Sequence, residues 1–257
     1  MPVLSNVRRG TNQVARLYRG STVLWNSTLP YAQEVLADSP VAYWRLEETS
    51  GSTVTDQTGN EHDGTVFGAD LNVSGPTGLG SAAYFDGVDD RIDVTNDAAL
   101  SGWDDFTVEF WTLDPINLKD TSKYPIANYS PLGSQRSWGV VDNGVLNQMV
   151  ILLSTNGVSF TAMNDAAIPG SDFSSTLWHH VVFRRSGSTV ESFLDGVKGG
   201  TSDTFSGTLH ASTARLTLGS RSDITSYWKG TLDEPAVYDT ALSDARILAH
   251  YNSVVSP

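Results

Sequence analysis

The sequence predicts an all-β protein built as a sandwich of two antiparallel sheets. Three observations support this prediction. Many short runs are rich in branched and aromatic residues, glycine-containing turn segments separate these runs, and no long amphipathic helix interrupts them. With 257 residues, the chain is long enough for one large β domain, since sandwiches often reach about 200–250 residues.

Seven segments show the strand pattern, in chain order: residues 41–46, 82–85, 106–113, 145–153, 178–185, 190–194 and 214–218. The third segment alternates, so that Glu109 and Trp111 face one way while Val108 and Phe110 face the other. The Asp-Asn-Gly sequence at 142–144 and the Asp-Gly sequence at 195–196 predict tight turns between neighbouring strands.

Two short helices complete the predicted sandwich. Residues 31–37 are expected to form a brief helical turn that stops at Asp38-Ser39-Pro40. Ser243 has the side chain of an N-cap and starts the last helix. The apolar stripe of that helix consists of Ile247, Leu248 and Tyr251.

The first 28 residues are expected to be a separate unit. Residues 14–18 and 22–25 are β-prone and are joined through Arg19-Gly20-Ser21, which predicts a β-hairpin. An isolated hairpin is marginal in water, so this one should dock on another surface. Residues 26–30 form a polar linker that ends in proline and leads to the sandwich of residues 29–257.

Composition excludes several classes of function. The chain has no cysteine, so disulfides, thiolate metal sites and cysteine nucleophiles are excluded. No apolar run approaches the ~20 residues that cross a bilayer, so membrane insertion is not expected, and the N-terminus lacks the apolar core of a signal peptide. All 29 Asp and Glu residues lie in residues 29–257, so nucleic acid is not an expected partner.

Six sequence motifs follow one another along the chain in an order that is characteristic of one family. They are residues 41–46 (Val-Ala-Tyr-Trp-Arg-Leu), 56–64, 84–90 (Tyr-Phe-Asp-Gly-Val-Asp-Asp), 106–111, 178–183 and 229–243. Together they resemble the laminin-G-like members of the concanavalin A-like family, and the resemblance covers residues 31–252. It implies a concanavalin A-like jelly-roll β-sandwich of two antiparallel sheets in which the two ends of the chain meet. The small N-terminal β-hairpin element precedes this sandwich.

The loop of residues 56–64 combines carboxylates, amides and glycines, and calcium prefers six to eight oxygen ligands of this kind. The resemblance implies that such a loop shares one ion with the aspartate of the C-terminal Leu-Asp-Glu motif. On this chain the ligands would be the side chains of Asp56 and Asp233 and the carbonyls near Asn60 and His62. The expected cofactor is therefore a structural calcium ion that ties the first strands to the last. The alternative is a metal-free turn in which Asp56 accepts hydrogen bonds from nearby N–H groups.

A second acidic group consists of Asp86, Asp89, Asp90 and Asp93. These residues are expected to shape a turn between two strands, and a ligand role is the alternative. His179 and His180 are adjacent on a predicted strand, so they point to opposite faces and cannot share a metal ion. We expect His180 to form hydrogen bonds within the sandwich.

Glycoside hydrolysis needs two carboxylates about 5–9 Å apart. The glucanases that this fold resembles carry theirs as alternating acids on one strand. Here Glu109 is followed two positions later by Trp111, and Asp114 falls on the other face. The chain also lacks a Gly-x-Ser-x-Gly elbow, a phosphate-binding loop and a His-Glu-x-x-His motif. We therefore expect no enzymatic activity.

Sugar binding uses exposed aromatic rings and a few polar groups. Four aromatic residues are expected in or beside loops, namely Trp103, Tyr124, Tyr129 and Trp138. They are the candidates for stacking on a sugar ring, and partial burial is the alternative.

The Arg-Gly hairpin with its strand tryptophan resembles short segments at the start of many phage tail-associated proteins. This resemblance implies a phage virion structural protein, a minor tail or virion-surface protein, located in the virion and assembled in the host cytoplasm. The sandwich would recognise a host-surface glycan. The hairpin would contact other virion proteins and further copies of this chain through Arg8, Arg9, Arg16, Arg19 and Trp25. A hairpin packed on its own sandwich is the structural alternative, and a free carbohydrate-binding module or lectin-like adhesin is the functional one.

Overall fold

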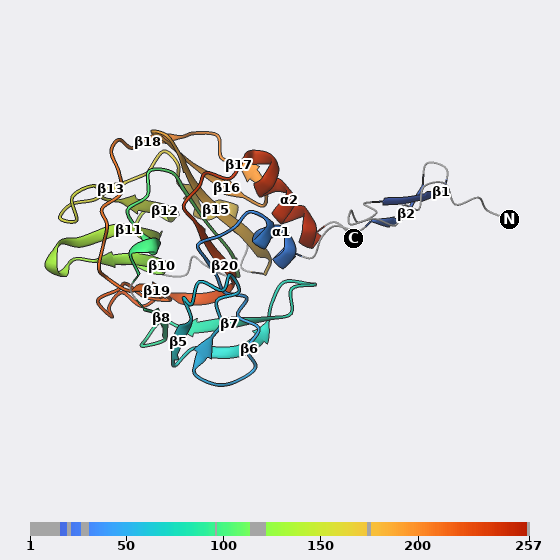
Figure 1. Cartoon of the computed structure of the whole chain (residues 1–257), viewed down its shortest axis with the longest axis horizontal. Helices are drawn as coiled ribbons and strands as arrows, with labels where there is room; N and C mark the ends of the chain where they lie inside the picture. Colours follow the sequence, from blue (N-terminus) through green and yellow to red (C-terminus); the bar gives the residue numbers. More distant parts are fainter. Residues whose placement is uncertain are drawn as a thin grey trace.

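The computed structural model describes the backbone of residues 16–19 and 22–26, and the full residues 31–95, 97–113, 122–173 and 176–255. Two nine-stranded sheets lie face to face in the described chain (Figure 1). Neighbouring strands pair in the antiparallel sense in both sheets. The predicted all-β sandwich of two antiparallel sheets is confirmed.

One of the two, which we call the back sheet, carries the helices. Its strand order is β17 (Val197–Lys198), β16 (Thr189–Leu194), β15 (Trp178–Ser186), β9 (Phe106–Leu113), β20 (Lys229–Tyr238), β7 (Ser81–Asp86) and β6 (Asp70–Ser74), with β18 (Asp203–Thr204) beside β16 and β3 (Ala42–Tyr43) beside β20. The first and last segments of the sandwich therefore pair directly, as the jelly-roll expectation requires.

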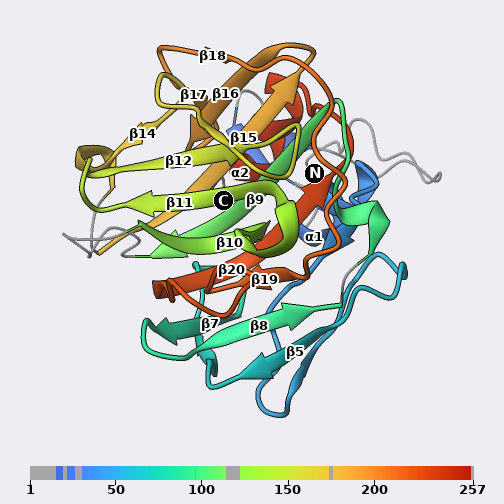
Figure 2. The same ribbon diagram turned by 90° about the vertical axis from the view of Figure 1, so that its left-hand side faces the viewer.

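The other, the front sheet, faces the viewer in Figure 2. Its order is β13 (Thr161–Ala162), β12 (Gln148–Leu153), β11 (Gln135–Asn143), β10 (Ser122–Ser130), β19 (Leu216–Leu218), β8 (Arg91–Val94), β5 (Gly64–Phe67) and β4 (Thr53–Val54), with β14 (Ile168–Pro169) also beside β12. Short 3-10 turns occur at Ala98–Leu100, Leu132–Ser134 and Gly170–Asp172.

The alternation predicted for residues 106–113 is present in β9. Val108 and Phe110 are buried in the main core between the sheets. Trp111 belongs to a second buried cluster, on the outer side of the back sheet. Full burial of each such large side chain contributes about 1.5–3 kcal/mol to folding, so both faces of this central strand stabilise the fold.

Helices α1 (Tyr31–Ala37) and α2 (Asp244–Val255) cover the outer side of the back sheet and lie next to each other (Figure 1). Ser243 caps α2 as predicted, since its hydroxyl accepts from the N–H of Arg246 at 3.3 Å. Ile247 is buried and Tyr251 packs on the cluster, whereas Leu248 is 43% exposed at the edge of the helix. The predicted stripe is therefore correct for two of its three residues.

The turn predictions are confirmed, because β11 and β12 form a hairpin after Asn143 and β16 turns into β17 at Asp195-Gly196. Both residues of the second turn have positive φ, 54° and 74°, which favours this dipeptide there. Three strand predictions shorten to β3, β12 and β19.

Strands β1 (Arg16–Arg19) and β2 (Thr22–Asn26) pair antiparallel as the predicted hairpin, and within the described ranges they join neither large sheet. Arg8 and Arg9 lie outside the described residues. The division at residue 28 and the assembly role of the hairpin remain predictions. In the described chain, no helix has the length and apolar character needed to span a membrane.

Candidate functional site

The carboxylate of Asp56 is nearly buried and accepts hydrogen bonds from its own loop and from β3. Its Oδ1 accepts from the backbone N–H groups of Tyr43 (3.1 Å) and Thr58 (3.0 Å). Its Oδ2 accepts from the N–H of His62 at 3.1 Å, and the Thr58 hydroxyl donates at 2.8 Å. These contacts are those of the metal-free turn, and they hold the loop against β3.

Asn60 and His62 also have partners on the first strands. The Asn60 side-chain amide donates to the carbonyl of Val41 at 2.9 Å, and the carbonyl of His62 accepts from the Trp44 indole N–H at 2.7 Å. The imidazole of His62 lies between two carboxylates, 3.4 Å from Asp56 and 3.3 Å from Asp97. The loop is thus cross-linked to neighbouring segments by its own polar groups.

Asp233 sits at a bulge of β20 with a different set of neighbours. The pairing of β20 with β9 shifts between Asp233 and Ala236, and Glu234 has a φ of 54°. Asp233 is fully buried, and one of its oxygens accepts from the N–H of Glu234 at 3.0 Å. The other, Oδ2, has no hydrogen-bond partner among the described residues. Burial, followed by the charges of Glu234 and Glu47, raises the pKa of Asp233 well above its ordinary value.

Glu234 is buried beside Asp233 and has two donors. The Tyr43 hydroxyl donates to one oxygen, and Arg45 Nε donates to the other at 3.3 Å. Burial raises the pKa of Glu234 to about 8, against the opposing effects of both donors. Arg45 also pairs with Glu47 at 2.9 Å, so one guanidinium faces several carboxylates in this cluster.

The surroundings of the Asp233 carboxylate suit a calcium ion better than those of the Asp56 carboxylate do. A buried carboxylate oxygen without a donor is costly, and a hard cation would satisfy it. The oxygens of Asp56 are already occupied by N–H and O–H donors. A calcium ion shared by Asp56 and Asp233 stays a prediction. Of the two carboxylates, Asp233 has the surroundings that favour binding the ion.

Asp86, Asp89 and Asp90 each place an oxygen within 4.8 Å of the others, and they form the one such cluster of three acidic or histidine ligands in the described chain. Asp90 accepts from the N–H of Asp86 at 2.8 Å, and Asp86 accepts from the N–H of Val88 at 2.7 Å. Burial and the neighbouring acids raise the pKa of Asp90. The hydrogen bonds support the turn interpretation of this group.

The four candidate aromatic residues do not form a sugar platform. Tyr124 and Tyr129 lie on β10 and Trp138 on β11, not in loops. They and Trp103 are buried, with exposures of 1–8%. Trp103 stacks on Trp138 at 6.0 Å, and their indole N–H groups donate to backbone carbonyls. The rings are core or near-core residues, which agrees with the alternative of burial and leaves little aromatic surface for a sugar.

A surface groove that the sequence did not predict lies at the β5–β8–β19 end of the front sheet. It has a volume of about 410 Å³ and is lined by Thr65, Phe67, Asp93, Val94, Thr95, Thr213 and Arg215. We call it the front-sheet groove. Phe67 is 40% exposed, and the Arg91 guanidinium lies 3.9 Å from the centre of its ring. Asp93 pairs with Arg91 at 3.2 Å and with Arg215.

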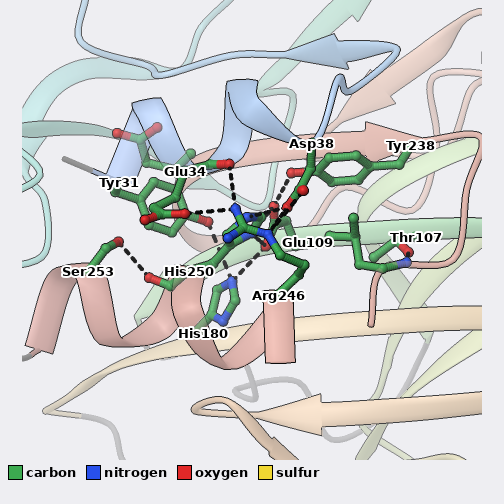
Figure 3. Close-up of polar contacts among 12 residues, drawn as sticks. Tyr31, Glu34, Asp38, Thr107, Glu109, His180, Tyr238, Arg246, His250 and Ser253 are labelled. Atoms are coloured by element: carbon green, nitrogen blue, oxygen red, sulfur yellow. Dashed lines mark hydrogen bonds and ion pairs between the residues drawn. The ribbon is translucent and has the colours of Figure 1, made fainter. Parts of the chain in front are cut away.

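On the opposite side of the sandwich, Glu109 forms the centre of a buried polar network beneath α1 and α2 (Figure 3). Its carboxylate receives His180 Nε2 at 3.0 Å, His250 Nδ1 at 3.0 Å and the hydroxyl of Tyr238. Burial opposes its ionisation, but the two histidines hold the pKa of Glu109 well below its ordinary value. The predicted internal hydrogen bond of His180 is confirmed. His179 binds Asp195 at 2.8 Å instead, which agrees with opposite orientations of the two histidines.

Comparison with known protein families assigns the chain to a superfamily. The sequence model of the concanavalin A-like lectin/glucanases superfamily matches residues 86–248. The chain belongs to this superfamily. The expectation drawn from the strand motifs is thereby confirmed, whereas no curated protein matches the chain.

Solved structures of the same fold include three of distinct kinds. The botulinum neurotoxin serotype D ligand-binding domain in complex with N-acetylneuraminic acid has a TM-score of 0.64 at 13% identity, over 85% of this chain and 52% of that one. The binding domain of Paraclostridial Mosquitocidal Protein 1 has a TM-score of 0.64 at 18% identity, with coverages of 85% and 53%. Trypanosoma rangeli sialidase in complex with the inhibitor DANA has a TM-score of 0.56 at 15% identity, with coverages of 82% and 32%.

At these identities the similarity establishes the fold. The chain spans about half the length of the toxin binding domains that it matches.

Proposed function

We propose that this chain is a carbohydrate-binding domain whose sugar site is the front-sheet groove. The observation that carries the proposal is the exposed ring of Phe67 beside the charged pair of Asp93 and Arg215. Sugar sites combine an aromatic surface for the C–H face of the ring with a few fixed polar groups for its hydroxyls. The groove offers both in one place.

The polar groups of the groove have donors and acceptors to spare. The Arg215 side chain is 42% exposed and uses one of its N–H groups on Asp93. A guanidinium has five N–H donors, so others can bind sugar oxygens. Thr65, Thr95 and Thr213 add hydroxyls that both donate and accept. Asp93 is held by two arginines, which fixes its orientation toward a ligand.

The superfamily and the similar structures agree with this proposal. The superfamily description includes lectins. Among the similar structures, a neurotoxin ligand-binding domain holds N-acetylneuraminic acid and a sialidase holds an inhibitor. Carbohydrate is therefore the ligand class to test first for this chain.

We further propose that the chain binds without catalysing a reaction. Glu109 occupies the strand that would carry the catalytic acids, but it is fully buried under the helices, and Trp111 stands where a second acid would be needed. The front-sheet groove is lined by a single acid, Asp93, which is neutralised by Arg91 and Arg215. Two free carboxylates at the spacing of a hydrolase are not found there.

We also propose display of the sandwich on a phage virion as a minor tail or virion-surface protein. The observation in its favour is the β1–β2 hairpin, which pairs with neither sheet of the sandwich among the described residues and could add its strand edges to a neighbouring protein. Repetition on a virion would turn weak glycan contacts into strong attachment. A free carbohydrate-binding module is the competing function.

Calcium is the proposed cofactor, with a structural role near Asp233. Asp233 would hold it through its unpartnered Oδ2, and the ion would neutralise a cluster in which burial makes negative charge costly. It would tie β20 to the segments that follow β3.

The direct test of the binding proposal is a glycan array probed with the full chain, followed by calorimetric titration of each hit. Neutral and carboxylated sugars should both be present, because Arg215 accommodates either class. Saturable binding of one related set of glycans supports the proposal. Binding to none of several hundred diverse glycans, or release of sugar during incubation, contradicts it.

A further inference from the structure

Both helices of the sandwich are fastened to the back sheet through one buried carboxylate. Figure 3 shows α1 and α2 with the labelled polar side chains gathered between them and the strands. Glu109 comes from β9, near the middle of the chain, and His250 comes from α2. The hydroxyl of Tyr31, from α1, lies 3.4 Å from Nε2 of His180, which binds the same carboxylate. The elements at the two ends of the sandwich therefore meet at one internal charge.

A continuous series of charged groups runs from that carboxylate to the surface. His250 Nδ1 lies 3.0 Å from Glu109, and His250 Nε2 lies 2.9 Å from Asp38, just after α1. Asp38 in turn binds Arg246 Nε at 2.7 Å, and Arg246 binds Glu34 of α1 at 2.7 Å. Acids and bases alternate along the series.

The position of His250 requires a proton on each ring nitrogen. Each nitrogen faces a carboxylate oxygen at hydrogen-bond distance, and a carboxylate can only accept. A neutral imidazole has one N–H, so its other nitrogen would present a lone pair to a negative oxygen. Only the imidazolium donates to both Glu109 and Asp38, and it also neutralises part of their charge.

We propose that His250 is a proton-operated latch: its imidazolium fastens α1 and α2 to the back sheet by bridging Asp38 and Glu109, and loss of that proton loosens the helix pair. Deprotonation would leave the fully buried Glu109 with the hydrogen bonds of His180 and Tyr238 but without the imidazolium of His250. A buried carboxylate in that state is costly, and separation of the helices from the sheet relieves the cost by admitting water.

The other titratable and charged groups around His250 are compatible with this role. Arg246 of α2 and Glu34 of α1 lie one step further out, at Asp38. The Tyr31 ring is edge-on to the imidazole at 6.0 Å, and burial raises the pKa values of Tyr31 and Tyr238, so both hydroxyls stay neutral. His180 reaches the same carboxylate from β15, with Tyr251 stacked beside it at 6.4 Å.

The pKa shifts define the pH range in which the latch operates. Burial lowers the pKa of His250, but Glu109 and Asp38 outweigh burial and raise it above its ordinary 6.5. The stabilisation is therefore complete below pH 6.5 and is lost as the pH rises through the raised pKa. While His250 is protonated, Glu109 carries its charge, because the two histidines lower its pKa against the effect of burial.

The test is amide hydrogen exchange of the full chain at pH 6 and pH 9, corrected for the intrinsic pH dependence of exchange. Peptides from 31–38 and 244–255 should lose at least tenfold of their protection at pH 9, whereas β15 peptides should keep theirs. His250→Gln should show the low helix protection at both pH values, and His210→Gln, a substitution outside the network, should behave like the wild type. Equal helix protection at both pH values, or parallel loss in β15, overturns the latch.

A second measurement decides the question if His250→Gln does not fold. In NMR spectra of histidine-labelled wild-type protein, one ring should be doubly protonated at pH 6 and titrate above the ordinary 6.5. Asp38→Asn should move that titration to lower pH by removing one of its two carboxylate partners. A neutral His250 at pH 6, or a titration that Asp38→Asn does not move, overturns the proposal.

Discussion

Glu109 and His250 lie 141 residues apart in the sequence, yet their side chains meet at 3.0 Å beneath the two helices. The contact joins a central strand of the back sheet to the last helix. The back sheet is therefore closed by helices that are held by charge as well as by apolar packing. The front sheet carries the proposed ligand groove on its outer side. The two sides of the sandwich have different roles in this account.

Replacement of Glu109 by glutamine should destabilise the protein strongly. Removal of one partner of a buried ion pair typically costs about 3–5 kcal/mol, because the remaining charge is left uncompensated. Urea denaturation at pH 6 measures the effect. Glu61→Gln, at an exposed loop position, is the matched control and should change the free energy of unfolding by less than about 0.5 kcal/mol. A loss below 1 kcal/mol for Glu109→Gln would contradict the electrostatic role.

Asp142 predicts a second pH effect, in the main core. It is fully buried on β11, and burial raises its pKa to about 7 against a hydrogen bond from Trp228. The folded state therefore favours the protonated form, so its stabilisation is complete below pH 3.8 and is lost as the pH rises through about 7. Asp142→Asn should stabilise the protein at pH 9 by about 1–3 kcal/mol. Denaturant titrations of the wild type and Asp142→Asn at pH 5 and pH 9 test this, with the exposed Asp239→Asn as control. If Asp142→Asn is no more stable than the wild type at pH 9, Asp142 is not a buried neutral carboxyl.

Calcium should raise the melting temperature, and chelation with EDTA should lower it, because an ion that binds only the folded state stabilises it. Asp233→Asn should abolish this calcium response. Asp56→Asn should destabilise the loop by about 1–3 kcal/mol whether or not calcium is present, since its hydrogen bonds are to N–H groups. Differential scanning calorimetry with and without calcium separates the two roles. Identical wild-type melting curves under both conditions would remove calcium from the account.

The hairpin prediction concerns assembly. A chain that starts at Leu29 should fold as a monomeric sandwich, because the two large sheets are complete without β1 and β2. The full chain should be an oligomer if the hairpin joins copies of itself through strand edges. Light scattering on both proteins measures this. An oligomer that persists after truncation would assign assembly to the sandwich, and monomers in both cases would favour a free binding module or a foreign partner.

The fold was largely predictable because its strongest strands have clear local patterns. The side chains of residues 106–113 alternate between two buried faces, and the observed strand β9 has the same bounds as the predicted one. Strands β10 and β11 were not predicted. Pro125 and Asn128 interrupt the pattern of β10, and Gly139 interrupts that of β11, so neither sequence alternates cleanly between apolar and polar residues. These segments are strands because they pair with neighbouring strands and pack in the interior of the fold.

The sites were less predictable, because they depend on contacts distant in sequence. Phe67, Asp93 and Arg215 form a groove only after β5, β8 and β19 become neighbours. Glu109 could be recognised as an unusual acid on a core strand, but no local signal pairs it with His250. The motif at Asp56 forms a hydrogen-bonded local turn. The proposed calcium ion depends on Asp233, a residue that the motif does not contain.

The most direct test of carbohydrate binding in the front-sheet groove is calorimetric titration of Phe67→Ala and Phe160→Ala with the best glycan from the array. The two phenylalanines have matched exposures of 40% and 41%, but only Phe67 lines the groove. We expect at least a tenfold loss of affinity for Phe67→Ala, about 1.4 kcal/mol, and a change of less than twofold for Phe160→Ala. Unchanged binding by Phe67→Ala would place the sugar elsewhere and contradict the proposed site.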